Sequence, residues 1–265
     1  MNAPFKTETL PEWNLADLYA GRDDPRIETD LAAAKAANDE LASLEGLFLQ
    51  ARGEPERLGV LLDRGIRLYE QATNGLWGVG AYAGLAASTA RDDPAWAKFE
   101  ADLRARSSAI AAESLFFSLE LNQLEDGELE AALKAYPAAA RWIPWLRRLR
   151  LSRPHELTPD LERYIVDRGP AVSNWVRLYD ETLAKLQAKV GDETLTLPEA
   201  LNRLSDPDGK RRKAAADGLA KALEARASTQ GLVLNTLAFE KQVEDRWRRF
   251  DSPAQSRHLA NEVDA

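Results

Sequence analysis

The sequence contains no cysteine and only two histidines, His155 and His258, among 265 residues. Without thiols the chain has no disulfide, no thiol nucleophile and no thiolate metal ligand. A closed tetrahedral zinc site would need both imidazoles, brought together from distant segments and completed by carboxylates. We therefore expect this chain to contain no catalytic residue and no metal-binding or other cofactor-binding residue.

The one His-Glu pair lies in the stretch RPHELTPDLE, residues 153–162. A zinc-protease motif reads H-E-x-x-H on a helix, because residues four apart share a helical face and two imidazoles can then bind one ion. Position 159 is proline instead of histidine. Thr158 and Pro159 indicate a helix start with Thr158 as N-cap, which leaves His155 in the preceding loop. We expect His155 to be an exposed connector residue and His258 to lie on the polar face of the last helix.

The chain also lacks long hydrophobic runs. Apolar residues are dispersed among charges, so no run approaches the roughly 20 residues that span a bilayer. The first residues, MNAPFKTETLPEW, have no basic start followed by an apolar core and do not resemble a secretory signal. These features predict a cytoplasmic protein without a membrane partner.

The formal net charge of −8 argues against a nucleic-acid partner, because phosphate binding depends on clusters of Lys and Arg. Two basic clusters run against this average, RWIPWLRRLRLSR at 141–153 and GKRRK at 209–213. The first mixes arginine with Trp142 and Trp145, a combination that can stack on single-stranded nucleic acid. The alternative is an amphipathic helix whose arginines extend around buried Trp and Leu. We favour the amphipathic helix and expect no nucleic-acid partner.

Alanine, leucine, glutamate and arginine dominate the chain, and apolar residues recur at spacings of three and four, which predicts a mainly α protein. One apolar stripe runs from Ile27 to Phe48, and a second helix begins near Pro55. The spacing from Trp96 to Leu124 predicts one long helix closed by the following EDG. Further helices are expected over roughly 127–136, 139–151, 159–168 and 170–188.

One segment breaks the helical pattern. KLQAKVGDETLTL has a Gly-Asp turn between two alternating runs, which predicts a small β-hairpin near 186–196. A helix then resumes with Thr196 and Glu199 at capping-box spacing, and Asp206 or Asp208 starts the next one. The expected organisation is an extended segment over 1–20, a helical amino-terminal lobe over 21–190, and a hairpin return with long helices over 191–265.

The glycines at 75, 78, 80 and 84 do not form a phosphate-binding loop. No strand precedes them, they lack the dinucleotide pattern, and no lysine follows them as a P-loop requires. We expect them to permit the close approach of two helices.

The end of the chain predicts a helix with Ser252 as its cap and Pro253 at its first position. Neither Gly nor Pro follows to end it. We expect this helix to continue uncapped to the last residue, which fits either a frayed natural end or a cut through a longer protein.

Several phrases, taken in order, resemble the amino-terminal part of oligoendopeptidase F, a bacterial zinc peptidase family in the thimet oligopeptidase group. They are WNLADLY, LFFSLELNQL, HELTPDLERYI, LTLPEAL, GKRRKAA and LNTLAFEKQVEDRWRRFDSPAQSRHLANEVD. The resemblance covers roughly residues 11–265, and its specificity comes from the order and spacing of the phrases.

The resemblance implies a helical lobe that forms one wall of a deep channel, which admits short unstructured peptides and excludes folded proteins. Members of the family are longer, and a later helical domain carries H-E-x-x-H with a further Glu as third zinc ligand. There the metal polarises the scissile carbonyl and acidifies its bound water, while the motif Glu is the general base. This sequence has no position that matches those residues.

The function implied is the non-catalytic, substrate-enclosing lobe of a zinc metallo-oligoendopeptidase, with short peptides and a missing carboxy-terminal catalytic domain as partners. Zinc is then the cofactor of the full-length enzyme, and this chain alone is inactive. The alternative is a stand-alone helical peptide- or protein-binding module without hydrolytic activity. An enzyme of another class would need an acid/base pair, which the abundant carboxylates do not single out. Peptide contacts could come from Trp142, Trp145, Arg147 or Arg246, although for each of them we favour core packing or a solvated helix face.

Overall fold

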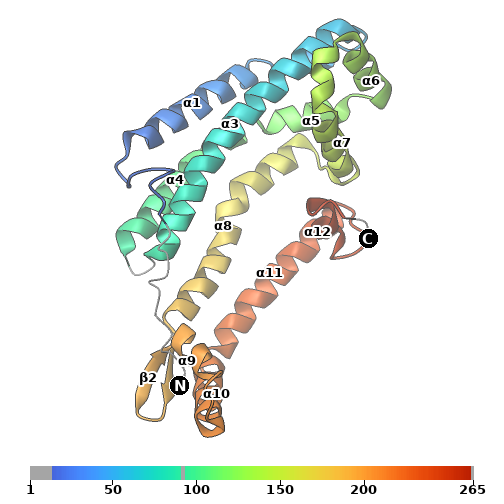
Figure 1. The fold of residues 1–265 in the computed structure, drawn as a ribbon. Coiled ribbons are helices and arrows are strands. Elements are labelled where there is room, and N and C mark those ends of the chain that lie inside the picture. The colour runs from blue at the N-terminus through green and yellow to red at the C-terminus, as the bar shows by residue number, and fades with distance from the viewer. Residues whose placement is uncertain (1–13, 91–92, 264–265) are drawn as a thin grey trace, which may run out of the picture. The chain divides into compact units, whose positions relative to one another are not determined.

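The structure, a computed structural model, describes residues 14–90 and 93–263. Its elements form two compact units, Met1–Arg150 (unit 1) and Leu151–Ala265 (unit 2). Both are helical, and one antiparallel pair of strands lies in unit 2, so the predicted mainly α fold with a small hairpin is confirmed (Figure 1). The division predicted at residues 20 and 190 stays a prediction, and most of the expected extended segment lies outside the described residues.

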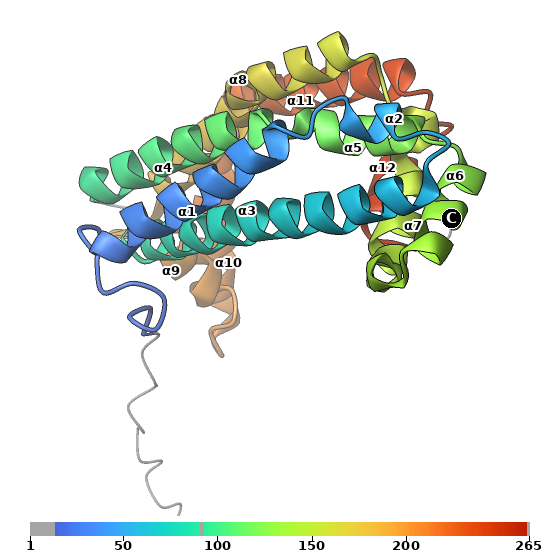
Figure 2. The same cartoon turned by 90° about the horizontal axis from the view of Figure 1, so that it is seen from above.

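Unit 1 is built around α3, a helix of 35 residues. Helices α1 and α4 pack along it and α6 packs near its start, and Figures 1 and 2 both show α1 beside α3. The elements are α1 (Pro25–Ala42), α2 (Leu47–Gln50), α3 (Pro55–Thr89), α4 (Pro94–Ala112), α5 (Leu115–Gln123), α6 (Asp126–Ala135), the 3-10 helix η1 (Pro137–Trp142) and α7 (Ile143–Ser152), whose last two residues belong to unit 2.

Helix α3 contributes to two hydrophobic clusters in unit 1. Its first half packs with α1, α2, α5 and α6 around Phe48 and Phe117, whose rings meet at 5.3 Å between centroids. Its second half packs with α1 and α4 around Tyr82, which contacts Tyr19 and Phe99 edge-on. The length of α3 therefore joins two cores into one unit.

Three glycines let other elements approach α3 closely. A Cβ atom at Gly59 would lie 2.4 Å from the Cβ of Tyr136 and 2.7 Å from the carbonyl oxygen of Ala132. At Gly65 it would lie 2.8 Å from the rings of both Phe48 and Phe117, and at Gly75 it would lie 3.0 Å from the Cβ of Ala34.

The close-approach role expected of the later glycines is therefore right at Gly75 and wrong at the other three. A Cβ at Gly78, Gly80 or Gly84 meets nothing within 4 Å. No neighbouring element packs closely on α3 at these positions, and the close contacts lie mainly earlier in the helix.

Unit 2 contains the 3-10 helix η2 (Arg153–His155), α8 (Pro159–Ala184), β1 (Gln187–Val190), β2 (Glu193–Thr196), α9 (Leu197–Arg203), α10 (Gly209–Glu224), α11 (Ala227–Trp247) and α12 (Gln255–Ala260). Strands β1 and β2 pair from Gln187↔Thr196 to Val190↔Glu193, and Gly191 turns the chain with φ +61°. The hairpin packs on α10 at Gly218, where a Cβ would lie 2.3 Å from the carbonyl oxygen of Lys189.

Three of the predicted helix starts in unit 2 are confirmed. Thr158 is the N-cap of α8 with Pro159 in the first turn, and Asp208 caps α10 by accepting from the N–H of Lys210. Thr196 and Glu199 form a capping box, in which the Thr196 N–H donates to the Glu199 carboxylate at 2.8 Å.

The prediction of a single long helix from Trp96 to Leu124 is wrong, because the helical structure is interrupted between α4, which ends at Ala112, and α5, which begins at Leu115. The Ser114 N–H and hydroxyl both donate to the Ala111 carbonyl, which tightens the last turn of α4. Asn38 of α1 donates to the Ile110 carbonyl at 2.9 Å, so a tertiary contact satisfies this helix end. The EDG segment begins α6 instead of closing a helix, since Glu125 and Glu128 form a capping box.

Two further boundaries were predicted wrongly, both near prolines. The helices expected over 159–168 and 170–188 are one helix, α8, which contains Pro170 and ends at Ala184 where the hairpin begins. An interior proline removes one backbone hydrogen bond at a cost of about 3 kcal/mol, which the rest of α8 offsets. The helix expected over 139–151 is η1 followed by α7, with Pro144 in the first turn of α7.

The final helix does not continue uncapped to the last residue. It begins at Gln255 and ends at Ala260 in a Schellman motif, in which Val263 donates to the His258 carbonyl and Glu262 to that of Leu259, both at 3.1 Å. Glu262 takes the left-handed conformation, φ +55°, that glycine usually supplies. The expectation of an uncapped helix is therefore wrong, and so is the expected start, because the N-cap is Ala254 instead of Ser252.

We predict opposite effects of alanine at two glycines of α3. Gly59→Ala forces α6 away from α3 and should lower the free energy of unfolding by about 2 kcal/mol, despite the better helix propensity of alanine. Gly78→Ala meets no neighbour and should raise it by about 0.8 kcal/mol. Urea unfolding followed by circular dichroism measures both, and equal changes in the two variants would contradict the close packing at Gly59.

Candidate functional site

A hollow of about 330 Å³ lies in unit 2, where the end of α11 and helix α12 meet the η2 segment. It contains His155, the residue that the sequence analysis singled out. The side chains that line it are Ser152, His155, Glu156, Glu244, Arg248, Phe250, Ser256 and Leu259.

The end of α11 places the groups around His155. The helix closes in a Schellman motif, with the Phe250 N–H on the Asp245 carbonyl at 2.9 Å and Arg249 left-handed at φ +59°. The reversal brings the Phe250 ring onto the His155 ring, 4.2 Å between centroids. The Nδ1 of His155 lies 2.9 Å from the Arg248 carbonyl.

His155 is therefore not the exposed connector that we expected. It is half-buried and held from two sides, by a ring and by a carbonyl. Because a carbonyl oxygen only accepts, Nδ1 carries the proton in the neutral ring. His258 is also half-buried, and its Nδ1 is shielded from water with no hydrogen-bond partner among the residues that the structure describes.

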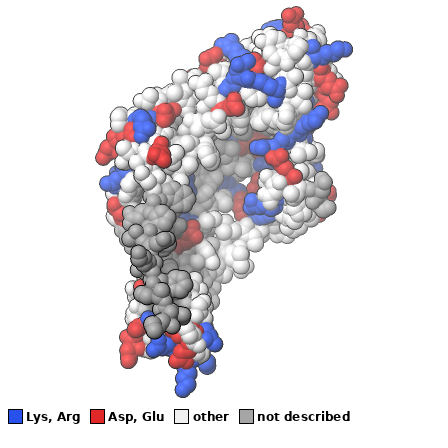
Figure 3. All heavy atoms as spheres, in the orientation of Figure 1, with Lys and Arg blue, Asp and Glu red and all other residues white. Residues whose placement is uncertain are grey.

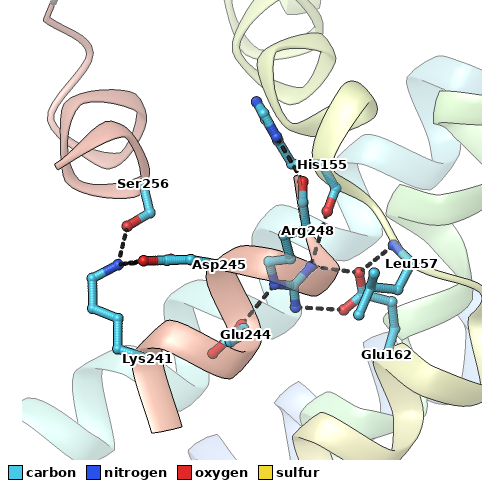
Figure 4. A network of polar contacts seen from close by, with 8 residues as sticks. All are labelled: His155, Leu157, Glu162, Lys241, Glu244, Asp245, Arg248 and Ser256. Atoms are coloured by element: carbon cyan, nitrogen blue, oxygen red, sulfur yellow. Dashed lines mark hydrogen bonds and ion pairs between the residues drawn. The ribbon is translucent and has the colours of Figure 1, made fainter. Parts of the chain in front are cut away.

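Arg248 is the centre of the polar network in Figure 4. Its guanidinium donates to both carboxylate oxygens of Glu162, at 2.7 and 2.9 Å, to Glu244 at 2.6 Å and to the His155 carbonyl at 3.3 Å. The Leu157 N–H also donates to Glu162, at 3.0 Å. This network joins the start of α8 to the end of α11.

The two charges of this pair are strongly coupled. Burial acts to raise the pKa of Glu162, but the hydrogen bonds from Arg248 and the Leu157 N–H outweigh it and lower that pKa below its ordinary value. The hydrogen bond from Arg248 to Glu162 in turn raises the pKa of Arg248. Both groups stay charged through the neutral range.

A smaller contact ties α12 to α11. Lys241 donates to both carboxylate oxygens of Asp245, at 2.7 and 2.8 Å, and to the Ser256 hydroxyl at 2.9 Å (Figure 4). Lys241 and Asp245 belong to α11 and Ser256 belongs to α12, so this contact bridges the Schellman turn that ends α11.

This arrangement fits a structural lock better than a catalytic centre. Glu162 is held ionised and fully engaged by Arg248, so it is not poised to exchange a proton near neutral pH. Over residues 14–90 and 93–263, no three His, Asp or Glu side chains lie together so that they could hold a metal ion. That this chain binds no metal stays a prediction.

Trp142 and Trp145, the aromatic residues considered as peptide contacts, both interact with other residues of unit 1. The Trp142 Nε1–H donates to Asp63 at 2.8 Å, and the Trp145 ring stacks on Phe117 at 6.1 Å between centroids. Arg150 donates to the carbonyls of Asn122 and Leu124 at the end of α5. The cluster therefore has the amphipathic character that we favoured, while the proposed contacts Arg147 and Arg246 are exposed.

The surface shows no strong single-sign patch on the face drawn in Figure 3, where acidic and basic side chains are intermingled. Among the described helices, none combines the length and the apolar character that crossing a membrane requires.

A larger hollow of about 680 Å³ lies in unit 1, along α3 and α4. We call it the α3–α4 groove. The sequence did not predict this groove, although small residues such as Gly80 and Ala81 on α3, and Ser107 and Ser108 on α4, line it. Small residues carry no pattern that distinguishes a groove from tight packing.

Comparisons with known proteins give a family match over part of the chain and a similar solved structure. A family model described as Oligopeptidase F matches residues 120–187, from α5 to the start of β1. The crystal structure of oligoendopeptidase-F from Enterococcus faecium shares the fold, with a TM-score of 0.73 and 15% sequence identity. The match covers 90% of this chain and 46% of that chain. No match was found among curated proteins.

The resemblance drawn from the order of sequence phrases is therefore confirmed. At 15% identity the structural match shows the fold alone, and this chain spans less than half the length of that solved chain.

We predict that Glu162→Gln lowers the free energy of unfolding by about 3 kcal/mol at pH 7, because it leaves the Arg248 charge without its main partner in a mostly buried site. The pKa of Glu162 is lowered by folding, so this stabilisation is present above the ordinary value of about 4.5 and is lost as the pH falls through the folded value. Urea unfolding at several pH values measures the difference.

The matched control is Glu181→Gln on the same helix, where the pair with Arg177 is exposed. Its effect should stay below about 0.5 kcal/mol. Equal losses in the two variants, or a Glu162 effect that grows toward acid pH, would contradict the lock.

Proposed function

We propose that this chain is the non-catalytic, substrate-enclosing lobe of a zinc metallo-oligoendopeptidase that hydrolyses short peptides. The observation that carries the proposal is the shared fold with oligoendopeptidase-F over 90% of this chain, joined by the family match at residues 120–187. In this proposal the chain binds and encloses the peptide, and the chemistry takes place on a partner region, the carboxy-terminal catalytic domain.

The imidazoles of this chain do not suit a catalytic zinc. The hydrogen bond from Nδ1 of His155 to a backbone carbonyl leaves Nε2 as a potential ligand, but in the described part of the chain no three His, Asp or Glu side chains lie together so that they could hold a metal ion. Zinc is therefore proposed as a cofactor of the catalytic domain, and no step of the reaction is assigned to residues here.

Exposed apolar side chains on α8 and α11 support the proposal that another part of the protein packs against unit 2. Each of these long helices has one buried residue, Glu162 in α8 and Val233 in α11. Large apolar side chains are instead exposed along both, which is typical of surfaces that pack on another part of an assembly. They are Tyr164, Val166, Val176, Leu178 and Tyr179 on α8, and Leu232, Leu234, Phe239 and Trp247 on α11.

The alternative function is a stand-alone helical module that binds peptides or proteins without hydrolysing them. The α3–α4 groove is an observation in its favour, because a groove formed by this chain alone offers a place for a peptide without the catalytic domain. In either case we propose a cytoplasmic protein with short peptides as partners and no nucleic acid.

We predict that the purified chain, dialysed and then assayed with an internally quenched nonapeptide, holds no stoichiometric zinc and cleaves no bond, with or without one added equivalent of Zn²⁺. Metal analysis and mass spectrometry of the peptide measure both. One bound zinc with steady cleavage would overturn the non-catalytic assignment.

The control for a contaminating peptidase is the variant His155→Asn/His258→Asn, which removes both imidazoles of the chain. Cleavage that persists in this variant comes from a contaminant, whereas cleavage that disappears with the imidazoles belongs to the chain and contradicts the proposal.

A further inference from the structure

The α3–α4 groove is formed where small residues on two antiparallel helices leave space between them. Helix α3 contributes residues from Tyr69 to Ala83, and α4 contributes residues from Glu100 to Ala111. At 1.5 Å per residue, the α3 wall is roughly 20 Å long. An extended peptide rises about 3.4 Å per residue, so the groove matches about six residues.

The floor of the groove contains a hydrogen-bond acceptor that lacks a donor. Asn38 of α1 borders the groove and is 1% exposed. Its Nδ2 donates to the Ile110 carbonyl at 2.9 Å, which fixes the orientation of the amide because a carbonyl cannot donate back. Its Oδ1 has no hydrogen-bond partner among the described residues. A buried acceptor without a donor is costly, which makes it a marker for a ligand.

Serine hydroxyls near this amide add further acceptors. Ser114 donates to the Ala111 carbonyl at 3.0 Å and Ser118 to the Leu115 carbonyl at 3.2 Å, so the proton of each is engaged and its lone pairs are left. The Ser107 oxygen has no partner within the described ranges. This end of the groove therefore suits a ligand that brings N–H donors.

The rest of the lining combines apolar side chains with a few polar ones and one ion pair, and it has no net charge. Leu76 and Leu103 face the groove, and Trp77 stands at its edge with 75% of its surface exposed. Glu100 and Arg104 are paired with each other, so neither is available to select a charged ligand. The ligand then combines apolar side chains with N–H groups.

We propose that the α3–α4 groove binds a short extended peptide, whose backbone N–H groups donate to Asn38 and the neighbouring serines and whose apolar side chain packs against Trp77. Rotation of the lining side chains gives the N–H access to the shielded Oδ1. An acyl chain has no N–H to offer, and an α-helix uses its own N–H groups internally. The proposal deepens the proposed function and rests on it for the supply of peptides.

The test uses two leucine substitutions on α3. Gly80 lines the groove and Gly78 does not, and a Cβ at either position meets nothing within 4 Å. Both variants gain helix propensity, so both should fold at least as well as the wild type, which thermal unfolding checks. Gly80→Leu places a side chain in the groove, and Gly78→Leu is the matched control.

The probe is a fluorescein-labelled, C-amidated hexapeptide of alternating leucine and serine, and binding is followed by fluorescence anisotropy. We expect Gly80→Leu to weaken binding about tenfold or more while Gly78→Leu stays within about twofold of the wild type. The same peptide with N-methylated backbone amides keeps the side chains but loses the N–H donors. It should bind the wild type as weakly as the unmodified peptide binds Gly80→Leu.

Three outcomes would overturn the groove assignment: no binding of the hexapeptide to the wild type, equal binding by the two leucine variants, or displacement of the peptide by laurate with no effect of N-methylation. None of these touches the zinc and cleavage assay, so the proposed function is judged separately. Conversely, a zinc-dependent cleavage by this chain would overturn the non-catalytic assignment and leave the groove result standing.

Discussion

The close approach of neighbouring elements to α3 is the constraint on which unit 1 depends. At Gly59 the backbone of α6 fills the space that a side chain would take, and at Gly65 the rings of Phe48 and Phe117 do so. Tight packing at these points holds the first half of α3 in one core, and its length carries the second half into another. Where the glycines continue without close neighbours, at Gly80, the same helix borders a groove instead.

The features that could be predicted from the sequence are those that neighbouring residues decide. Helix starts at Thr158 and Asp208 and the hairpin turn at Gly191 depend on groups within a few positions, so their signals are local. The break before α5 was missed because Asn38, from α1, binds the Ile110 carbonyl. Such a contact, across a large sequence separation, leaves no local pattern.

The candidate sites were harder to predict for related reasons. His155 was expected in solvent, but its partners Arg248 and Phe250 come from the far end of unit 2. They are positioned by a helix end that uses Arg249 where glycine is usual, so the sequence carries no signal for the turn. The α3–α4 groove was invisible because it is made of small residues and one buried amide whose lone acceptor only the structure reveals.

We propose that this lobe works with a catalytic region, because the matched oligoendopeptidase-F chain extends well beyond the match, which covers 46% of that chain. The most direct measurement is the gene sequence beyond the codon for Ala265. We expect the same frame to continue into helical sequence with H-E-x-x-H and a later glutamate. A stop codon directly after Ala265 would contradict it and would make peptide binding without hydrolysis the leading function.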